Sequence, residues 1–82
     1  MANLKTRLTD AICNRARPAT QEYALRDERQ ASLILRVRPS GTKTWEVRER
    51  TNGVSTRSTL GTFPSMGVKT ARKAAVAFLA GD

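Results

Sequence analysis

The sequence predicts an α+β domain. In it, a three- to four-stranded antiparallel sheet packs against a C-terminal helix, and a short helix precedes the sheet. Apolar and polar residues alternate with period two in the middle of the chain, which is typical of strands. Asn52-Gly53 favours a tight hairpin, because both residues tolerate positive φ. From Val68 onward, apolar residues recur at helical spacing. The 82 residues are enough for one domain, 1–82, which we expect to be ordered over 8–80.

The N-terminal part is predicted to contain one short helix. The first eight residues carry no clear pattern and are expected to fray. Thr9 is the predicted N-cap, with Asp10 in the first turn, where the helix dipole favours a carboxylate. The helix continues over Ala11 to Arg17. Pro18 ends it, because the residue before a proline avoids the helical conformation.

Four strands and a second helix are predicted after this point. The strands are Glu22 to Asp27 at one edge of the sheet, Ser32 to Arg38, Thr44 to Arg50, and Val54 to Leu60. The second helix runs from Val68 to about Ala80.

The Asn52-Gly53 turn fixes the register of the last two strands. The pairs that it predicts include Arg48–Arg57, Glu46–Thr59 and Trp45–Leu60. Directly opposed residues share a face, so Trp45, Val47 and Leu60 are predicted to face the helices.

The first hairpin requires a turn of odd length. A two-residue Ser40-Gly41 turn would mix apolar and charged side chains on both faces, and an odd turn centred on Gly41 avoids this. The predicted pairs are Val37–Trp45, Leu35–Val47, Arg38–Thr44, Arg36–Glu46 and Ile34–Arg48. Ile34 is expected to be exposed on the outer face.

The charge balance favours an anionic partner. Fifteen Lys and Arg residues face seven Asp and Glu, for a net charge of +8, and eleven of the fifteen are arginine. The planar guanidinium suits phosphates and guanine edges, so nucleic acid is the predicted partner. The sequence lacks the long apolar run of a membrane span or signal peptide, and no membrane partner is expected. The single cysteine, Cys13, cannot form an internal disulfide, and a reducing cytoplasm is expected.

The predicted outer face of the sheet collects arginines. Its polar members are Arg36, Arg38, Arg48, Arg50 and Arg57, with Thr44, Ser55 and Thr59 among them. Opposed like charges such as Arg48 and Arg57 destabilise a sheet by a few tenths to about 1 kcal/mol. A sheet that receives phosphates or guanine edges in the major groove would use that pair. The alternative is a solvated face that Glu46 and Glu49 partly balance.

A second, weaker site is predicted on the last helix. Lys69, Arg72 and Lys73 lie near its N-terminus, where cations oppose the helix dipole, and a bound phosphate would reverse the conflict. The alternative is that both lysines only solvate the helix.

The ordered motifs resemble a known family. They are Leu8-Thr9-Asp10, Tyr23-Ala24-Leu25-Arg26-Asp27, Leu35-Arg36-Val37, Ser40 to Trp45, Leu60 to Met66, and Val68 to Lys73. Over residues 8 to 76 the chain resembles the amino-terminal arm-type DNA-binding domain of phage and genomic-island integrases, which are tyrosine recombinases. Two positions depart from the family pattern. Gln30-Ala31 stands where a small-residue turn with glycine is usual, and Gly67 stands where a Ser or Thr commonly caps the last helix.

The resemblance implies sequence-specific binding of double-stranded DNA at arm-type attachment-site repeats, in the integration and excision of a prophage or genomic island. The positions that match the family's DNA-binding sheet face are Arg36, Lys43, Thr44, Arg48, Arg50 and Arg57. Other integrase protomers are further implied partners, and the bacterial cytoplasm, at the nucleoid, is the implied location.

The fragment is not expected to be an enzyme. It has no histidine, and its one tyrosine, Tyr23, falls in a predicted edge strand. No metal or cofactor motif is visible, so no cofactor is expected, and the catalytic domain is expected beyond Asp82. Two alternatives remain. A double-stranded RNA-binding domain has the same order of elements, and Gly67 to Ala75 resembles its basic second helix. A basic module that recruits an acidic protein is the other.

Overall fold

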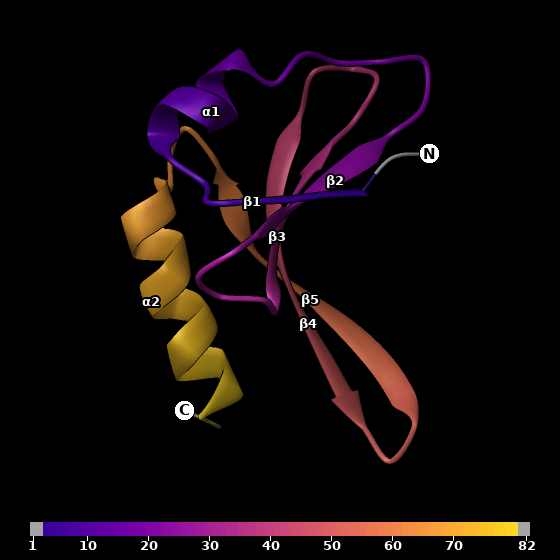
Figure 1. Ribbon diagram of the computed structural model, residues 1–82, viewed down its shortest axis with the longest axis vertical. Coiled ribbons are helices and arrows are strands. Elements are labelled where there is room, and N and C mark those ends of the chain that lie inside the picture. Colours follow the sequence, from indigo (N-terminus) through magenta and orange to yellow (C-terminus); the bar gives the residue numbers. More distant parts are fainter. Residues whose placement is uncertain (1–2, 81–82) are drawn as a thin grey trace.

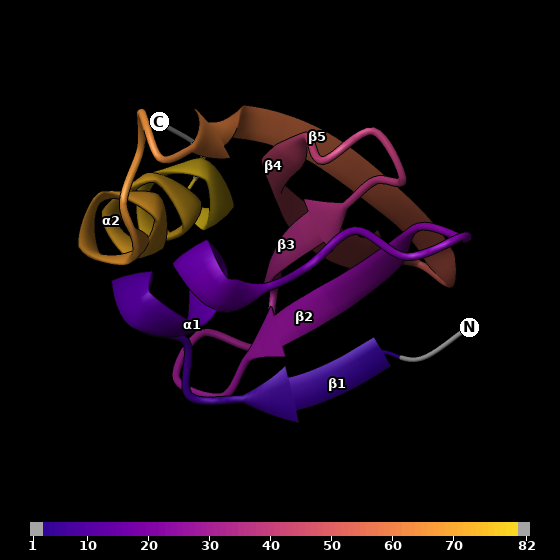
Figure 2. The same ribbon diagram turned by 90° about the horizontal axis from the view of Figure 1, so that it is seen from above.

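The computed structural model describes residues 3–80 and confirms the α+β fold. The elements are β1 (Asn3–Thr6), α1 (Asp10–Arg15), β2 (Tyr23–Asp27), β3 (Leu33–Val37), β4 (Lys43–Thr51), β5 (Val54–Phe63) and α2 (Val68–Leu79). The strands form one sheet in the order β1-β2-β3-β4-β5, and β2 to β5 are antiparallel. Both helices lie on the same side of this sheet (Figure 1, Figure 2). We call that side the inner face and the opposite side the outer face.

The N-terminal segment is more ordered than predicted. Fraying of the first eight residues was expected, but Asn3–Thr6 form β1, which pairs in parallel with β2. β2 is therefore an interior strand and not the predicted edge. A parallel pair needs a crossover connection, which α1 and its flanking loops provide. Residues 1–2 and 81–82 of the predicted 1–82 domain lie outside the described residues.

The cap predicted for the first helix is confirmed. The Thr9 hydroxyl accepts a hydrogen bond from the Ile12 N–H at 3.1 Å. The helix ends at Arg15, two residues before the predicted Arg17, because Ala16 already adopts an extended conformation.

The last hairpin has the predicted register over most of its length. Arg48 faces Arg57 and Glu46 faces Thr59. A bulge between Trp45 and Glu46 then shifts the register, so that Gly61 and not Leu60 lies opposite Trp45. The Trp45–Leu60 pairing was therefore wrong. Leu60 still packs against the core as a partly buried side chain.

The first hairpin has the predicted faces but not the predicted pairs. Its turn is odd in length, as expected, but Arg38 N–H donates to Thr42 O, which centres the turn on Ser40 rather than Gly41. Gly41 adopts φ +98°, the positive value that the last residue of such a three-residue turn requires. The observed pairs are Leu33–Val47, Ile34–Glu46, Leu35–Trp45, Arg36–Thr44 and Val37–Lys43. Each residue of β3 thus faces a partner two positions earlier than predicted, and a shift of two keeps every side chain on its face.

The core lies between the inner face and α2. Its fully buried sheet residues are Leu33, Leu35, Val37, Trp45 and Val47. Ala71 and Ala75 of α2 are also fully buried, and their small side chains let the helix approach the sheet closely. The Trp45 indole N–H donates to Met66 O at 2.7 Å, which satisfies the one polar group of this side chain.

A buried ion pair joins α2 to the sheet. Arg72 donates to both oxygens of Asp27, at 2.7 and 3.0 Å, and also to Leu8 O at 2.8 Å. The Asp27 carboxylate is fully buried and accepts further bonds from the N–H groups of Leu8 and Gln30. Burial alone would raise the pKa of Asp27. The hydrogen bonds from Arg72 and from backbone N–H groups, together with the positive charge of Arg72, outweigh burial and hold the pKa below its ordinary value.

Candidate nucleic-acid interface

The outer face brings together most of the predicted binding residues. Alternation along β3, β4 and β5 puts six of them on this side: Arg36, Thr44, Arg48, Arg50, Arg57 and Thr59. Arg38 follows β3 and pairs with the same carboxylate as Arg36, which places it beside them. Among these, Arg50, Arg57 and Thr59 are exposed, and Arg48 is half-buried. Arg38 is half-buried as well, so solvent reaches these five side chains.

The centre of the outer face is closed to solvent. Ile34, predicted to be exposed, is only 2% exposed, and Thr44 is 8% exposed. Ile34 lies between Arg26 on β2 and Glu46 on β4, in register with both. Long polar side chains cover neighbouring apolar surface with their aliphatic stems, so a residue on the outer face need not be exposed.

Arg36 is held by two carboxylates. Its Nε donates to both oxygens of Glu46 at 3.1 Å, and its terminal nitrogen donates to Glu22 at 2.9 Å. The hydrogen bond that Arg36 donates to Glu46 is the main cause of a raised pKa for the Arg36 guanidinium. Glu22 also accepts from the half-exposed Arg38 at 3.3 Å. Because Arg36 is only 6% exposed, it lies beneath the surface that a ligand would meet.

Glu46 also reaches the exposed part of the face. One of its two carboxylate oxygens, Oε1, also lies 4.0 Å from a terminal nitrogen of Arg57, whose side chain is 54% exposed. The Arg57 guanidinium is therefore drawn toward a nearly buried carboxylate while most of it faces solvent. Arg48 lies directly opposite Arg57 with the same charge.

The exposed arginines belong to a projecting ribbon. β3 ends its pairing with β4 at Leu33–Val47, and residues 48–57 continue beyond it as a two-stranded hairpin (Figure 1). The outer face of this ribbon carries Arg48, Arg50 and Arg57, together with Ser55. A two-stranded ribbon is narrow enough to enter the major groove of B-form DNA.

Lys43 is not part of the outer face. It pairs in register with Val37 and Phe63, whose side chains lie on the inner side with the helices. Its ammonium donates to Cys13 O at 2.8 Å and Asn14 O at 3.2 Å, and lies 5.8 Å from the centre of the Phe63 ring. Lys43 thus caps the C-terminal carbonyls of α1.

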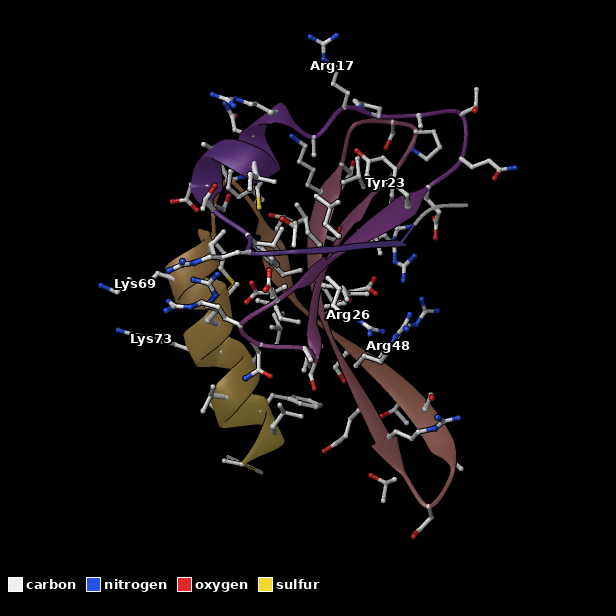
Figure 3. The ribbon with its side chains drawn as sticks, viewed as in Figure 1. Arg17, Tyr23, Arg26, Arg48, Lys69 and Lys73 are labelled. Carbon is white, nitrogen blue, oxygen red and sulfur yellow. The ribbon has the colours of Figure 1, made fainter. Side chains whose placement is uncertain are left out.

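Lys69 and Lys73 lie on the exposed side of α2, away from the outer face (Figure 3). The protein itself compensates the predicted unfavourable interaction between these cations and the helix dipole. The Asp10 carboxylate accepts the Val68 N–H at 2.9 Å and supplies the acceptor that Gly67 lacks. The helix N-terminus therefore needs no bound phosphate to complement it.

Arg26 was absent from the predicted site. It lies on the outer face, opposite Ile34, and points to the same side as Arg48 (Figure 3). The signal was present in the alternation of β2, because Tyr23 and Leu25 occupy the other side. No turn motif fixed the register of β2, so its outer residues could not be assigned neighbours.

Comparison with known protein families identifies a match over most of the chain. The sequence model of the family described as the arm DNA-binding domain matches residues 8–81. No curated protein matches the chain. Over residues 3–80, no helix is long and apolar enough to cross a membrane, and no three His, Cys, Asp or Glu side chains gather as a metal site.

Proposed function

The chain belongs to the arm DNA-binding domain family, a non-catalytic DNA-binding module found in integrases, and we propose that it binds double-stranded DNA sequence-specifically through its outer face. In this proposal the β4–β5 ribbon enters the major groove. The observation that carries it is the cluster of Arg48, Arg50 and Arg57 on a ribbon that projects beyond the rest of the sheet. Guanidinium groups bind guanine edges in bidentate fashion in that groove.

The predicted residues take different parts in this interface. Arg48, Arg50 and Arg57 contact bases or adjacent phosphates, and Thr59 contributes a hydroxyl beside them. Arg36 acts through Glu46, which it holds against Arg57, and is a positioning residue. Arg38 and Thr44 border the same face. Lys43 supports the fold at α1. Lys69 and Lys73 lie on the exposed side of α2, away from the outer face, and take no part in the interface that we propose.

The biological role that fits this binding is recognition of arm-type repeats beside an attachment site. The parent protein would be a tyrosine recombinase that integrates and excises a prophage or genomic island in the bacterial cytoplasm, with other protomers on neighbouring repeats. The family match supports the DNA-binding part of this proposal.

The test begins with selection of a preferred sequence from a randomised duplex library. Binding of the selected duplex, a scrambled duplex and a duplex RNA is then measured across a salt series. The expected result is that the selected DNA binds most tightly at every salt concentration, with a log–log slope of roughly −0.9 per phosphate contacted. Tighter binding of RNA, or failure of the selection to enrich any sequence, would overturn the proposal.

A further inference from the structure

A groove lined by three arginines lies beside the ribbon. Its walls are formed by Arg26, Ala31, Ser32, Arg48, Arg50 and Ser55, and its volume is about 490 Å³. Arg26 comes from β2, Arg48 and Arg50 come from β4, and Ser32 lies in the turn that leads into β3. Arg48 N–H donates to Ser32 O at 2.7 Å, and this hydrogen bond joins the turn to the ribbon.

The groove concentrates positive charge that the protein does not neutralise. Among the side chains that the structure describes, no carboxylate lies within 4.0 Å of a guanidinium nitrogen of Arg26, Arg48 or Arg50, whereas Arg36, Arg38, Arg57 and Arg72 each have such a partner. Like charges gathered at one groove repel each other, and an anion bound between them would replace this repulsion with attraction. Two serines at the same walls supply hydroxyl donors.

The width of the sheet indicates which side chains around this groove contact DNA bases and which contact backbone phosphates. Neighbouring strands are about 4.8 Å apart, so β3 to β5 span about 10 Å and β2 to β5 about 14 Å. The major groove of B-form DNA is about 12 Å wide. With its strands along the groove, a sheet can therefore insert β3 to β5, whereas β2 lies at the rim, where the phosphates run.

We propose that Arg26 binds one backbone phosphate of the DNA strand that borders the inserted sheet, next to Arg48 and Arg50 at the same groove. The inference rests on the proposed function and adds Arg26 to it as a binding residue that positions the domain on the duplex without reading its sequence. Arg26 reaches the phosphate from β2 at the rim, while Arg48 and Arg50 lie on the inserted ribbon and face the bases.

The test compares Arg26→Ala with Lys73→Ala across a salt series, on the selected and the scrambled duplex. Lys73 lies on the far side of the molecule, and its loss changes the net charge equally (Figure 3). Arg26→Ala is expected to reduce the steepness of the log–log salt dependence by roughly 0.9 and to weaken binding roughly fivefold near 0.15 M salt, on both duplexes alike. Lys73→Ala should leave the slope unchanged.

Arg26→Lys is the control for misfolding of the alanine variant, because it keeps the aliphatic stem and the positive charge. It should retain the wild-type slope, and circular dichroism of all three variants checks the fold. An unchanged slope in Arg26→Ala, or a change in its preference between the two duplexes, overturns the phosphate assignment. Failure of the sheet proposal would look different, because Arg57→Ala would then leave the preference for the selected over the scrambled duplex unchanged.

Discussion

The carboxylate of Asp10 lies 2.9 Å from the backbone nitrogen of Val68 and accepts its hydrogen bond, so the first turn of α1 caps the start of α2. Gly67 makes this contact possible. A Cβ built at position 67 would lie 3.2 Å from the nearer Asp10 oxygen. The missing side-chain cap at Gly67 is therefore replaced by a carboxylate from another helix, and the absence of a Cβ leaves room for it.

Asp10→Ala and Gly67→Ser should be coupled. Asp10→Ala removes the cap and should lower the free energy of unfolding by about 1 kcal/mol. Gly67→Ser alone should also destabilise, because its Cβ crowds Asp10. In the double variant the serine hydroxyl can cap α2 itself, so the combined loss should be smaller than the sum. Urea unfolding of the four proteins measures this, and strict additivity would contradict the interpretation.

Arg72→Met should be among the most destabilising single changes. It keeps the aliphatic stem but leaves Asp27 buried without its guanidinium, and such a loss costs about 3 kcal/mol. Lys73→Met is the matched control, since Lys73 is the next residue and is exposed. It should change the free energy of unfolding by less than about 0.5 kcal/mol. If the two variants unfold at the same urea concentration, the ion pair does not stabilise the fold.

Acid should destabilise the protein through Asp27. The folded pKa of Asp27 is lowered, so its stabilising contribution is complete above the ordinary pKa of about 3.9 and is lost as the pH falls through the folded value. The free energy of unfolding should therefore decline from about pH 5 downward. The ¹³C shift of the Asp27 carboxyl group tests the cause directly. A carboxyl that titrates at or above its ordinary pKa would show that another group is responsible.

Arg57→Thr should separate stability from DNA binding. It removes the repulsion between Arg57 and Arg48, which is worth a few tenths to about 1 kcal/mol, and places a β-favouring residue in β5. Arg57 is half exposed and 4.0 Å from Glu46, so little is lost with that contact. We expect an unchanged or higher thermal midpoint together with weaker binding of the selected duplex. A stability loss of more than about 1 kcal/mol would show that Arg57 serves the fold instead.

Cys13 should resist alkylation in the folded state. Its side chain is fully buried, and burial is the main cause that raises the pKa of the thiol to about 11. Iodoacetamide labelling at pH 8 should therefore be slow in buffer and rapid in urea. Mass spectrometry follows the reaction, and labelling in buffer as fast as in urea would mean that α1 detaches readily from the sheet.

Local patterns predicted the faces of the sheet well, and the exact pairing less well. Asn52-Gly53 is a turn of defined length, so the register from Arg50 to Glu46 followed from it. In the first hairpin, alternation could distinguish only odd from even turns. The positive φ of Gly41 at the last turn position, which decides between the two odd registers, became evident only in the structure.

Other features depend on contacts between distant segments and were not predictable from local patterns. β1 is four residues long and pairs in parallel with β2. Neither a long alternation of apolar and polar residues nor a hairpin turn therefore predicts it from the sequence. The position of Lys43 beneath α1 requires knowledge of how α1 packs. Likewise, alternation assigned Ile34 and Arg36 to the outer face correctly, but their burial depends on neighbours from β2 and the preceding loop.

The two contacts that fix α2 bear on how the domain is made on the ribosome. Asp10 and Val68 are 58 residues apart in the chain, and Asp27 and Arg72 are 45 apart. A nascent chain that has emerged only as far as β5 holds both carboxylates without their partners. The sheet can therefore gain its final stability only after the last helix has left the exit tunnel, which makes folding of this domain a late event of its synthesis.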